Sequence, residues 1–277
     1  TYAEGDADEK GDIFLLDIAS GYISLISTGL ADSYYAPTIS STGKYITYYG
    51  GSGHSTAPWK YVSAIYVFNV ETGVTTELDS TTTGVDLFAK SSLDISADGK
   101  YVLLDHSNGG EFSLTNTEEQ SETLLPYPAH ADSESKLSAD GRFVLFQQGH
   151  HISYAPLHIY DTKTAQTTVL SVATDGSNSP TRVSMGNFAV SGDGRYITVV
   201  SKEAGFNGEV KVIVYDRVAH QTSVVNEGQF FFATSATKNS LDISEDGHYI
   251  VFDNYVATNP FFISSQYCEG YENFKLQ

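Results

Sequence analysis

The chain of 277 residues contains little cysteine, little proline and little positive charge. Cys268 is its only cysteine, so no internal disulfide framework can form. The 15 Lys and Arg residues stand against 34 Asp and Glu residues, for a net charge of −19. A surface of that sign repels nucleic acid and anionic membranes. No apolar run approaches the roughly 20 residues that span a bilayer, so the sequence predicts no membrane insertion.

A six-residue motif occurs five times. In each copy a Ser is followed three residues later by Gly, then by a cationic residue or His, and then by an aromatic residue. The glycines are 42 to 56 residues apart, a period typical of repeat architectures. The copies are Ser40–Tyr45, Ser96–Tyr101, Ser138–Phe143, Ser191–Tyr196 and Ser244–Tyr249.

A second motif alternates with the first. It is a strand-like run that ends in Asp or Asn, followed by a polar turn and a Thr- or Ser-rich strand. Asp and Asn bond their own following backbone, and Asp-Gly between apolar runs is a strong hairpin signal. Each repeat is therefore predicted to contain two hairpins, or four antiparallel strands. The copies are Ile13–Asp17, Ile65–Asn69, Phe112–Asn116, Leu157–Asp161 and Val212–Asp216.

A four-stranded unit of this length is typical of a propeller blade. The sequence predicts an all-β fold, a five-bladed β-propeller of four-stranded antiparallel blades. The second hairpin of a unit, at 12–28, and the first hairpin of one, at 240–254, would together close the last blade, with strands from both termini. A larger propeller cut short is the alternative. The predicted organisation is an acidic loop at 1–11, one propeller domain at 12–260 and an aromatic-rich tail at 261–277.

The pattern Ser-x-Asp-Gly-[Lys/Arg]-[Tyr/Phe] followed by the Asp-terminated strand resembles the TolB-like family of WD-like β-propeller repeats. The resemblance covers roughly 12–254 and is strongest over 158–254. The first copy departs from it, with Thr42 in place of Asp, and the hairpin from Asn116 to Leu125 lacks the turn Gly. The resemblance implies the fold and often an exported location, and it implies no activity.

The location of the protein is predicted to be extracellular, periplasmic or at the cell surface. The chain begins at Thr1 and has Met185 as its only methionine, so we expect a processed mature protein or an excised domain. Its abundance of Thr, Ser, Tyr and Val is typical of an exported all-β domain.

Binding is predicted on one face of the propeller, because short turns join strands at one end of each blade and long loops join them at the other. The expected role is a non-enzymatic binding or assembly module, and its partner is a protein or a glycan. Aromatic rings and short polar groups in the long loops suit either partner, although each ring could instead pack against its own loop. The candidate ligand-binding residues are Tyr34, Tyr35, His54, Trp59, Asp105, His106, His130, Asp132, His150 and His151.

Calcium is the cofactor that the sequence favours, ahead of a transition metal held by His106, His130, His150 and His151. Asp6, Asp8 and Asp12 have the spacing of oxygen ligands in a calcium loop, with Asp17 at its last position. Lys10 occupies a position where such a loop needs an oxygen ligand. The alternative is an acidic connecting loop without metal.

An enzyme is the alternative function, a glycan hydrolase or lyase with carboxylates in the central funnel. The predicted catalytic residues are Asp94, Glu134 and Asp242, because paired carboxyl groups across a narrow funnel suit acid–base chemistry. Lys136 would instead form an ion pair with either aspartate. The tail at 261–277 lies outside the repeat and is expected to pack across the propeller or to contact another subunit.

Overall fold

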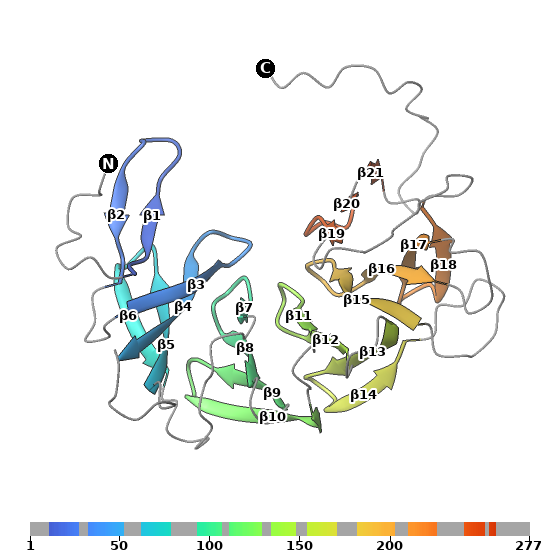
Figure 1. The fold of residues 1–277 in the computed structure, drawn as a ribbon, viewed down its shortest axis with the longest axis horizontal. Coiled ribbons are helices and arrows are strands. Elements are labelled where there is room, and N and C mark those ends of the chain that lie inside the picture. Colours follow the sequence, from blue (N-terminus) through green and yellow to red (C-terminus); the bar gives the residue numbers. More distant parts are fainter. Residues whose placement is uncertain are drawn as a thin grey trace.

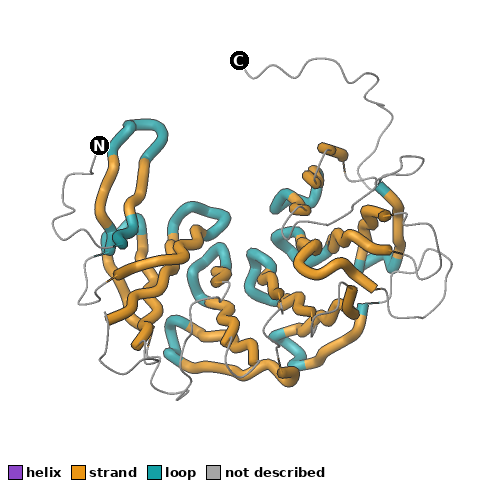
Figure 2. The backbone as a smooth tube through the Cα atoms, viewed as in Figure 1, coloured by secondary structure: helices purple, strands orange, loops and turns teal. Residues whose placement is uncertain are grey.

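The structure is a computed structural model. It describes residues 11–27, 33–52, 62–78, 93–106, 111–128, 134–147, 154–170, 182–202, 210–225, 241–252 and 255–258. These residues form only strands and loops (Figure 2). The predicted all-β fold is confirmed, and the sheets follow one another around an arc (Figure 1).

Four successive blades make up most of the arc, and each has four antiparallel strands. In every blade the first strand lies nearest the centre of the arc (Figure 1). Blade 1 contains β3 (Ser33–Ile39), β4 (Tyr45–Ser52), β5 (Val62–Asn69) and β6 (Val74–Leu78). Blade 2 contains β7 (Leu93–Ile95), β8 (Tyr101–His106), β9 (Glu111–Asn116) and β10 (Ser121–Pro128). Blade 3 contains β11 (Glu134–Leu137), β12 (Phe143–Gln147), β13 (Tyr154–Asp161) and β14 (Gln166–Val169). Blade 4 contains β15 (Arg182–Val190), β16 (Tyr196–Lys202), β17 (Val210–Asp216) and β18 (Gln221–Val224).

Smaller sheets stand at the two ends of the arc (Figure 1). The first end is a hairpin of β1 (Phe14–Leu16) and β2 (Ile23–Leu25). The other, called the end unit here, contains β19 (Leu241–Ile243), β20 (Tyr249–Phe252) and β21 (Tyr255–Thr258). Blades 3 and 4 are also joined by backbone pairing, because Tyr154–Pro156 of β13 pairs with Arg182–Ser184 of β15.

The six-residue motif forms the turn between the first two strands of each unit, here called the motif turn. In the copy that begins at Ser191, the Ser hydroxyl accepts a hydrogen bond from the Tyr196 amide at 3.0 Å and donates one to Asp193 at 2.8 Å. The same Asp193 carboxylate accepts from the Arg195 amide at 2.9 Å. Gly194 has a φ of 68°, a left-handed conformation that glycine adopts without a steric penalty. The spacing of Ser, Asp and Gly therefore follows from one hydrogen-bonded turn.

Thr42 gives the first motif turn a different bond. Its hydroxyl lies 3.2 Å from the Ser40 hydroxyl and donates to the carbonyl of Ala97 in blade 2 at 2.7 Å. The residue that breaks the sequence motif thus links two blades.

The turn between the third and fourth strands is capped by the Asp or Asn of the second motif. In blade 4, Asp216 accepts hydrogen bonds from the amides of Val218 and Ala219 at 2.9 and 3.0 Å, and its carboxylate is paired with Arg195 at 2.8 Å. Arg142 and Asp161 form the equivalent pair in blade 3 at 2.9 Å. These pairs join the two turns of a blade, so both turns lie on the same side of the arc. The prediction that the short turns share one face is confirmed for the described turns.

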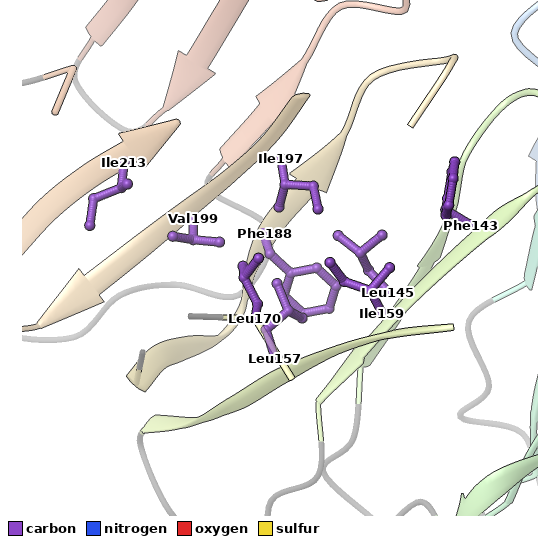
Figure 3. Close-up of a cluster of buried hydrophobic side chains, with 9 residues drawn as sticks. All are labelled: Phe143, Leu145, Leu157, Ile159, Leu170, Phe188, Ile197, Val199 and Ile213. Atoms are coloured by element: carbon purple, nitrogen blue, oxygen red, sulfur yellow. The ribbon is translucent and has the colours of Figure 1, made fainter. Parts of the chain in front are cut away.

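A hydrophobic core fills each space between neighbouring sheets. Figure 3 shows the core between blades 3 and 4, where Phe188 is surrounded by Leu145, Leu157, Ile197 and other apolar side chains. Blades 2 to 4 have a neighbour on both faces, so most residues on both faces of their central strands are buried, including all five residues of β12. Equivalent cores include Val102 and Leu104 between blades 1 and 2, Phe112 and Phe146 between blades 2 and 3, Ile250 and Phe252 between blade 4 and the end unit, and Ile13 and Tyr48 between the β1–β2 hairpin and blade 1.

One contact, the aromatic–glycine contact, recurs at every described junction of motif turns. The aromatic residue of one motif turn lies against the glycine of the next, so closely that a Cβ on Gly99 would be 2.5 Å from the Tyr45 ring and one on Gly247 would be 2.6 Å from the Tyr196 ring. Real Cβ atoms do not approach so closely, so only glycine fits. The four pairs are Tyr45 with Gly99, Tyr101 with Gly141, Phe143 with Gly194 and Tyr196 with Gly247.

The predicted closure of a fifth blade by strands from both termini is not seen among the described strands. β1 pairs only with β2, and β20 pairs with β19 and β21. The physical reason is that β21 occupies the edge of β20 where closure would place β1. The sequence prediction missed β21 because Tyr255–Thr258 lacks the Asp-terminated pattern of the other third strands.

Gly99→Ala and Gly43→Ala form a matched pair that tests the aromatic–glycine contact. Both glycines have positive φ, 73° and 70°, so alanine at either costs about 1–2 kcal/mol through backbone strain. Only at Gly99 would the new methyl group also meet an aromatic ring, which adds about 1–3 kcal/mol. Urea denaturation should therefore show a clearly larger loss for Gly99→Ala. Equal losses would contradict the close contact with Tyr45.

Candidate axial site

A pocket of about 270 Å³ lies where the first strands of the four blades and the end unit converge. It contains residues from all five units, so these strands surround one axis, as expected of a propeller. Residues of the motif turns also line it, which places the pocket toward the short-turn side. The lining residues are Ile39, Ser41, Asp94, Ile95, Lys136, Leu137, Ala139, Ala189, Val190, Gly192, Asp242, Ile243 and Glu245.

Asp94 connects two inner strands at this axis. One carboxylate oxygen accepts a hydrogen bond from the amide of Leu137 in blade 3 at 2.9 Å, and the other accepts from the amide of Ile95 at 3.0 Å. The inner edge of a first strand has no neighbouring strand to satisfy its amides. The carboxylate supplies the missing acceptors and ties blade 2 to blade 3.

The surroundings of Asp94 shift its pKa in opposite directions. Burial is the largest influence and raises the pKa of Asp94. The Leu137 hydrogen bond, the Lys136 charge and the Ile95 hydrogen bond lower it, whereas the negative charge of Asp242 raises it further. Burial prevails, so the pKa of Asp94 lies above its ordinary value.

The other predicted catalytic residues lie nearby with different surroundings. Asp242 lines the same pocket and accepts a hydrogen bond from the Ile243 amide at 2.9 Å. Glu134 is the first residue of β11, two residues before Lys136, so both side chains lie on one face of the strand. The structure therefore brings Asp94, Lys136 and Asp242 to one pocket. Their predicted catalytic role stays a prediction.

Ser41 and Glu245 also line the pocket, and the sequence analysis did not select them. Each directly follows the Ser of a motif turn, as Ala139 and Gly192 do. Their position in the repeat could have identified them, because equivalent residues of a propeller lie at the same distance from its axis.

Four of the predicted ligand-binding residues are strand residues rather than loop residues. Tyr34 and Tyr35 lie in β3, opposite Gly50 and Tyr49, and Asp105 and His106 lie in β8. The strands are longer than predicted because pairing with β4 and β9 continues past the apolar runs. The side chains of these four are not described by the structure. The remaining predicted residues, His54, Trp59, His130, Asp132, His150 and His151, lie outside the described residues.

Among the predicted calcium ligands, Asp6 and Asp8 lie outside the described residues. Asp12 accepts a hydrogen bond from the Ser27 hydroxyl at 2.7 Å, and Asp17 accepts one from the Ser20 amide at 2.8 Å. These bonds hold the β1–β2 hairpin together. Within the described ranges, no three His, Cys, Asp or Glu residues are grouped to hold a metal ion, and no helix could cross a membrane.

The blades around a common axis define the chain as a β-propeller-type protein. No protein-family model and no curated protein matches it. Solved structures do resemble it, and among them is TolB from Acinetobacter baumannii, with a TM-score of 0.51 and 18% identity. That match covers 86% of this chain and 52% of TolB.

Two peptidases are similar to the same degree. The match to Porphyromonas gingivalis dipeptidyl peptidase 4 has a TM-score of 0.57 and 13% identity, over 89% of this chain and 41% of that one. The match to a puromycin-hydrolyzing peptidase of Mycobacterium tuberculosis has a TM-score of 0.56 and 13% identity, and it covers 88% of this chain and 38% of the peptidase. This chain thus spans about half or less of each structure. The TolB-like resemblance is confirmed for the fold, which these proteins share.

The pH dependence of Asp94→Asn tests the buried carboxyl group. Its pKa is higher in the folded state, so its contribution to stability is largest below the unfolded pKa of about 3.9 and declines as the pH rises through the folded pKa. The wild type should therefore gain stability relative to Asp94→Asn as the pH falls from 7 to 4. Urea denaturation of both proteins across that range measures the difference. A difference that stays constant, or moves the other way, would contradict this account.

Proposed function

We propose that this chain is a non-enzymatic binding module that engages a protein partner through the side of the arc opposite the motif turns. The supporting observation is that the short turns of the blades all lie on one side of the arc. Within each described blade both short turns lie on one side and are tied together by ion pairs such as Arg195 with Asp216. The strand ends that lead into the connections between blades, and into those between second and third strands, therefore lie on the other side. Longer connections tolerate variation and commonly carry binding residues.

The lengths of those connections support this choice. Residues 79–92 link blades 1 and 2, residues 53–61 link β4 to β5, and both stretches are longer than any motif turn. The second contains His54 and Trp59, and an aromatic anchor among polar residues is typical of interface hot spots. A glycan is the other ligand that such residues suit. A location outside the cytoplasm, where a TolB-like propeller would be expected, is part of the proposal, and calcium held by Asp6, Asp8 and Asp12 is its one candidate cofactor.

The alternative function, a glycan hydrolase or lyase, is supported by Asp94 and Asp242 lining one pocket. The hydrogen bonds of Asp94 favour a structural role, since each of its two carboxylate oxygens accepts a backbone amide. The fold alone does not distinguish a binding module from an enzyme, because TolB and a peptidase both have a similar fold. The sequence contains no Gly-x-Ser-x-Gly motif for a serine nucleophile.

Photo-cross-linking can locate the binding side. A photoreactive phenylalanine analogue is placed at Trp59, in the sequence between β4 and β5, and in a second variant at Val218, which is exposed in the short turn after β17. In cells that express the chain, irradiation should give a discrete protein adduct from the Trp59 position and none from the Val218 position. Adducts from Val218 alone would contradict the proposed side.

A glycan array and a reducing-sugar assay separate the alternatives. The account predicts no release of sugar from any polysaccharide, with or without EDTA. Release that Asp94→Asn and Asp242→Asn abolish would establish the enzyme instead. Glycan binding without release, lost in EDTA, would make the ligand a glycan and assign a calcium role to the Asp6–Asp12 segment.

A further inference from the structure

Among the described residues, each end of the arc carries one half of an aromatic–glycine contact without the other half. Each internal aromatic–glycine contact combines a ring from one unit with a glycine from the next. In the end unit, the Tyr249 ring meets no following glycine within the described ranges and is 61% exposed, whereas its equivalents Phe143 and Tyr196 are 3% and 4% exposed. In blade 1, no atom of the described residues lies within 4 Å of the Cβ position of Gly43.

Apolar side chains at both ends of the arc are exposed where the equivalent side chains of the inner blades are buried. Alternate residues of β20 are buried, with Ile250 and Phe252 against blade 4, while Val251 is 51% exposed beside Tyr249. In blade 1, Ile39 is 55% exposed, although the equivalent residues of blades 2 and 3, Ile95 and Leu137, are buried against the preceding blade.

The hydrogen bonds that join successive motif turns also lack a partner at each end of the arc, within the described residues. The Ala97 amide donates to the Ala139 carbonyl at 2.7 Å, and the Gly192 amide donates to the Glu245 carbonyl at 2.8 Å. At the other two junctions the donor differs: the Asp140 amide donates to the Gly192 carbonyl, and the Thr42 hydroxyl donates to the Ala97 carbonyl. In each case a motif turn donates to the residue that follows the Ser of the next motif turn, so the end unit should donate to a following unit and the Ser41 carbonyl should accept from a preceding one. Neither has such a partner among the described residues. The second carboxylate oxygen of Asp242 likewise lacks a donor there, although the equivalent oxygen of Asp94 bonds the next blade.

The β1–β2 hairpin shows where the missing element belongs. It packs on the face of blade 1 that is turned away from blade 2, through Ile13 and Ile26 against Ile46 and Tyr48. Its strands correspond to the third and fourth strands of a blade, because Asp17 caps the turn between them as Asp216 does in blade 4. β1 is unpaired on its inner edge, the edge at which a second strand lies in the complete blades.

We propose that the open end of the arc is a docking surface for one β-hairpin of a partner polypeptide, a hairpin that carries a Ser-x-Asp-Gly turn followed by a cation and an aromatic residue. Its glycine receives the Tyr249 ring, its aromatic ring lies on Gly43, and its second strand pairs with β1. One hairpin thereby supplies both missing halves and completes the blade that β1 and β2 begin.

The size and charge of the site favour a single hairpin. Ser41 of blade 1 and Glu245 of the end unit line the same axial pocket, so the two ends approach each other at the axis, and one hairpin is the smallest element that supplies both missing halves. A hollow of about 630 Å³ beside Tyr249 is lined by Asp193, Glu245 and Asp246 among others. These carboxylates favour a hairpin whose glycine is followed by Lys or Arg. The docking surface is distinct from the side of the arc opposite the motif turns, and the inference does not depend on the proposed function.

The test uses a repeat hairpin of the chain itself as the probe. A fluorescent peptide with the sequence of residues 187–202 contains the Ser191–Tyr196 motif. A disulfide between Ala189→Cys and Thr198→Cys, which are cross-strand partners in β15 and β16, holds it as a hairpin, since short hairpins are marginally stable in water. Titration with the full chain should give saturable binding by fluorescence anisotropy.

Matched variants distinguish this docking from non-specific association. Tyr196→Ser or Gly194→Ala in the peptide, and Tyr249→Ser in the protein, should each weaken binding by about tenfold, a factor equivalent to 1.4 kcal/mol. Val218→Ser, at an exposed turn residue far along the chain from the site, should leave it unchanged.

Two outcomes would overturn the inference. One is no binding of the cyclised peptide, or binding that the three substitutions leave unaltered. The other is a loss of stability in Tyr249→Ser as large as that in Tyr196→Ser, measured by urea denaturation of the chain alone. That result would mean that Tyr249 already lies on Gly43 and that the chain closes on itself as a five-bladed ring.

Discussion

The contact of an aromatic ring with the glycine of the next motif turn is the constraint on which the arrangement of the blades depends. It requires a residue without a side chain at positive φ, a ring that begins the second strand, and a turn that holds both in place. The Ser and Asp of the motif supply that turn through their hydrogen bonds. Because each unit offers a ring on one side and a glycine on the other, the contact links units in one direction around the axis.

Much of this architecture could be predicted from the sequence because it rests on local chemistry. The hairpins follow from Asp-Gly turns and from Asp or Asn caps, which act within a few residues. Other turns could not be located by glycine alone: Gln120, Ala165 and His220 have φ between 49° and 54° where Gly21 and Gly73 stand in the other repeats. The extent of β3 and β8 and the presence of β21 depend on pairing with partner strands, which local patterns do not encode.

The candidate site was predicted in part. Asp94, Lys136 and Asp242 hold one repeat position, and equivalent positions of a propeller converge at its axis, so repeat counting alone was enough to group them. What the sequence could not show is that the Asp94 carboxylate is engaged by the amides of Leu137 and Ile95. Those bonds depend on how neighbouring inner strands are offset. They make the Asp94 carboxylate a link between blades 2 and 3.

The most direct test of this account is the exchange rate of four backbone amides, measured by NMR. Ala97, Asp140 and Gly192 donate hydrogen bonds to the next motif turn, whereas Glu245, which follows its Ser as Ala97 and Gly192 do, has no acceptor among the described residues. The account predicts slow exchange at the first three amides and fast exchange at Glu245. Protection of Glu245 as strong as that of Gly192 would contradict it, because the end of the arc would then already be joined to another unit.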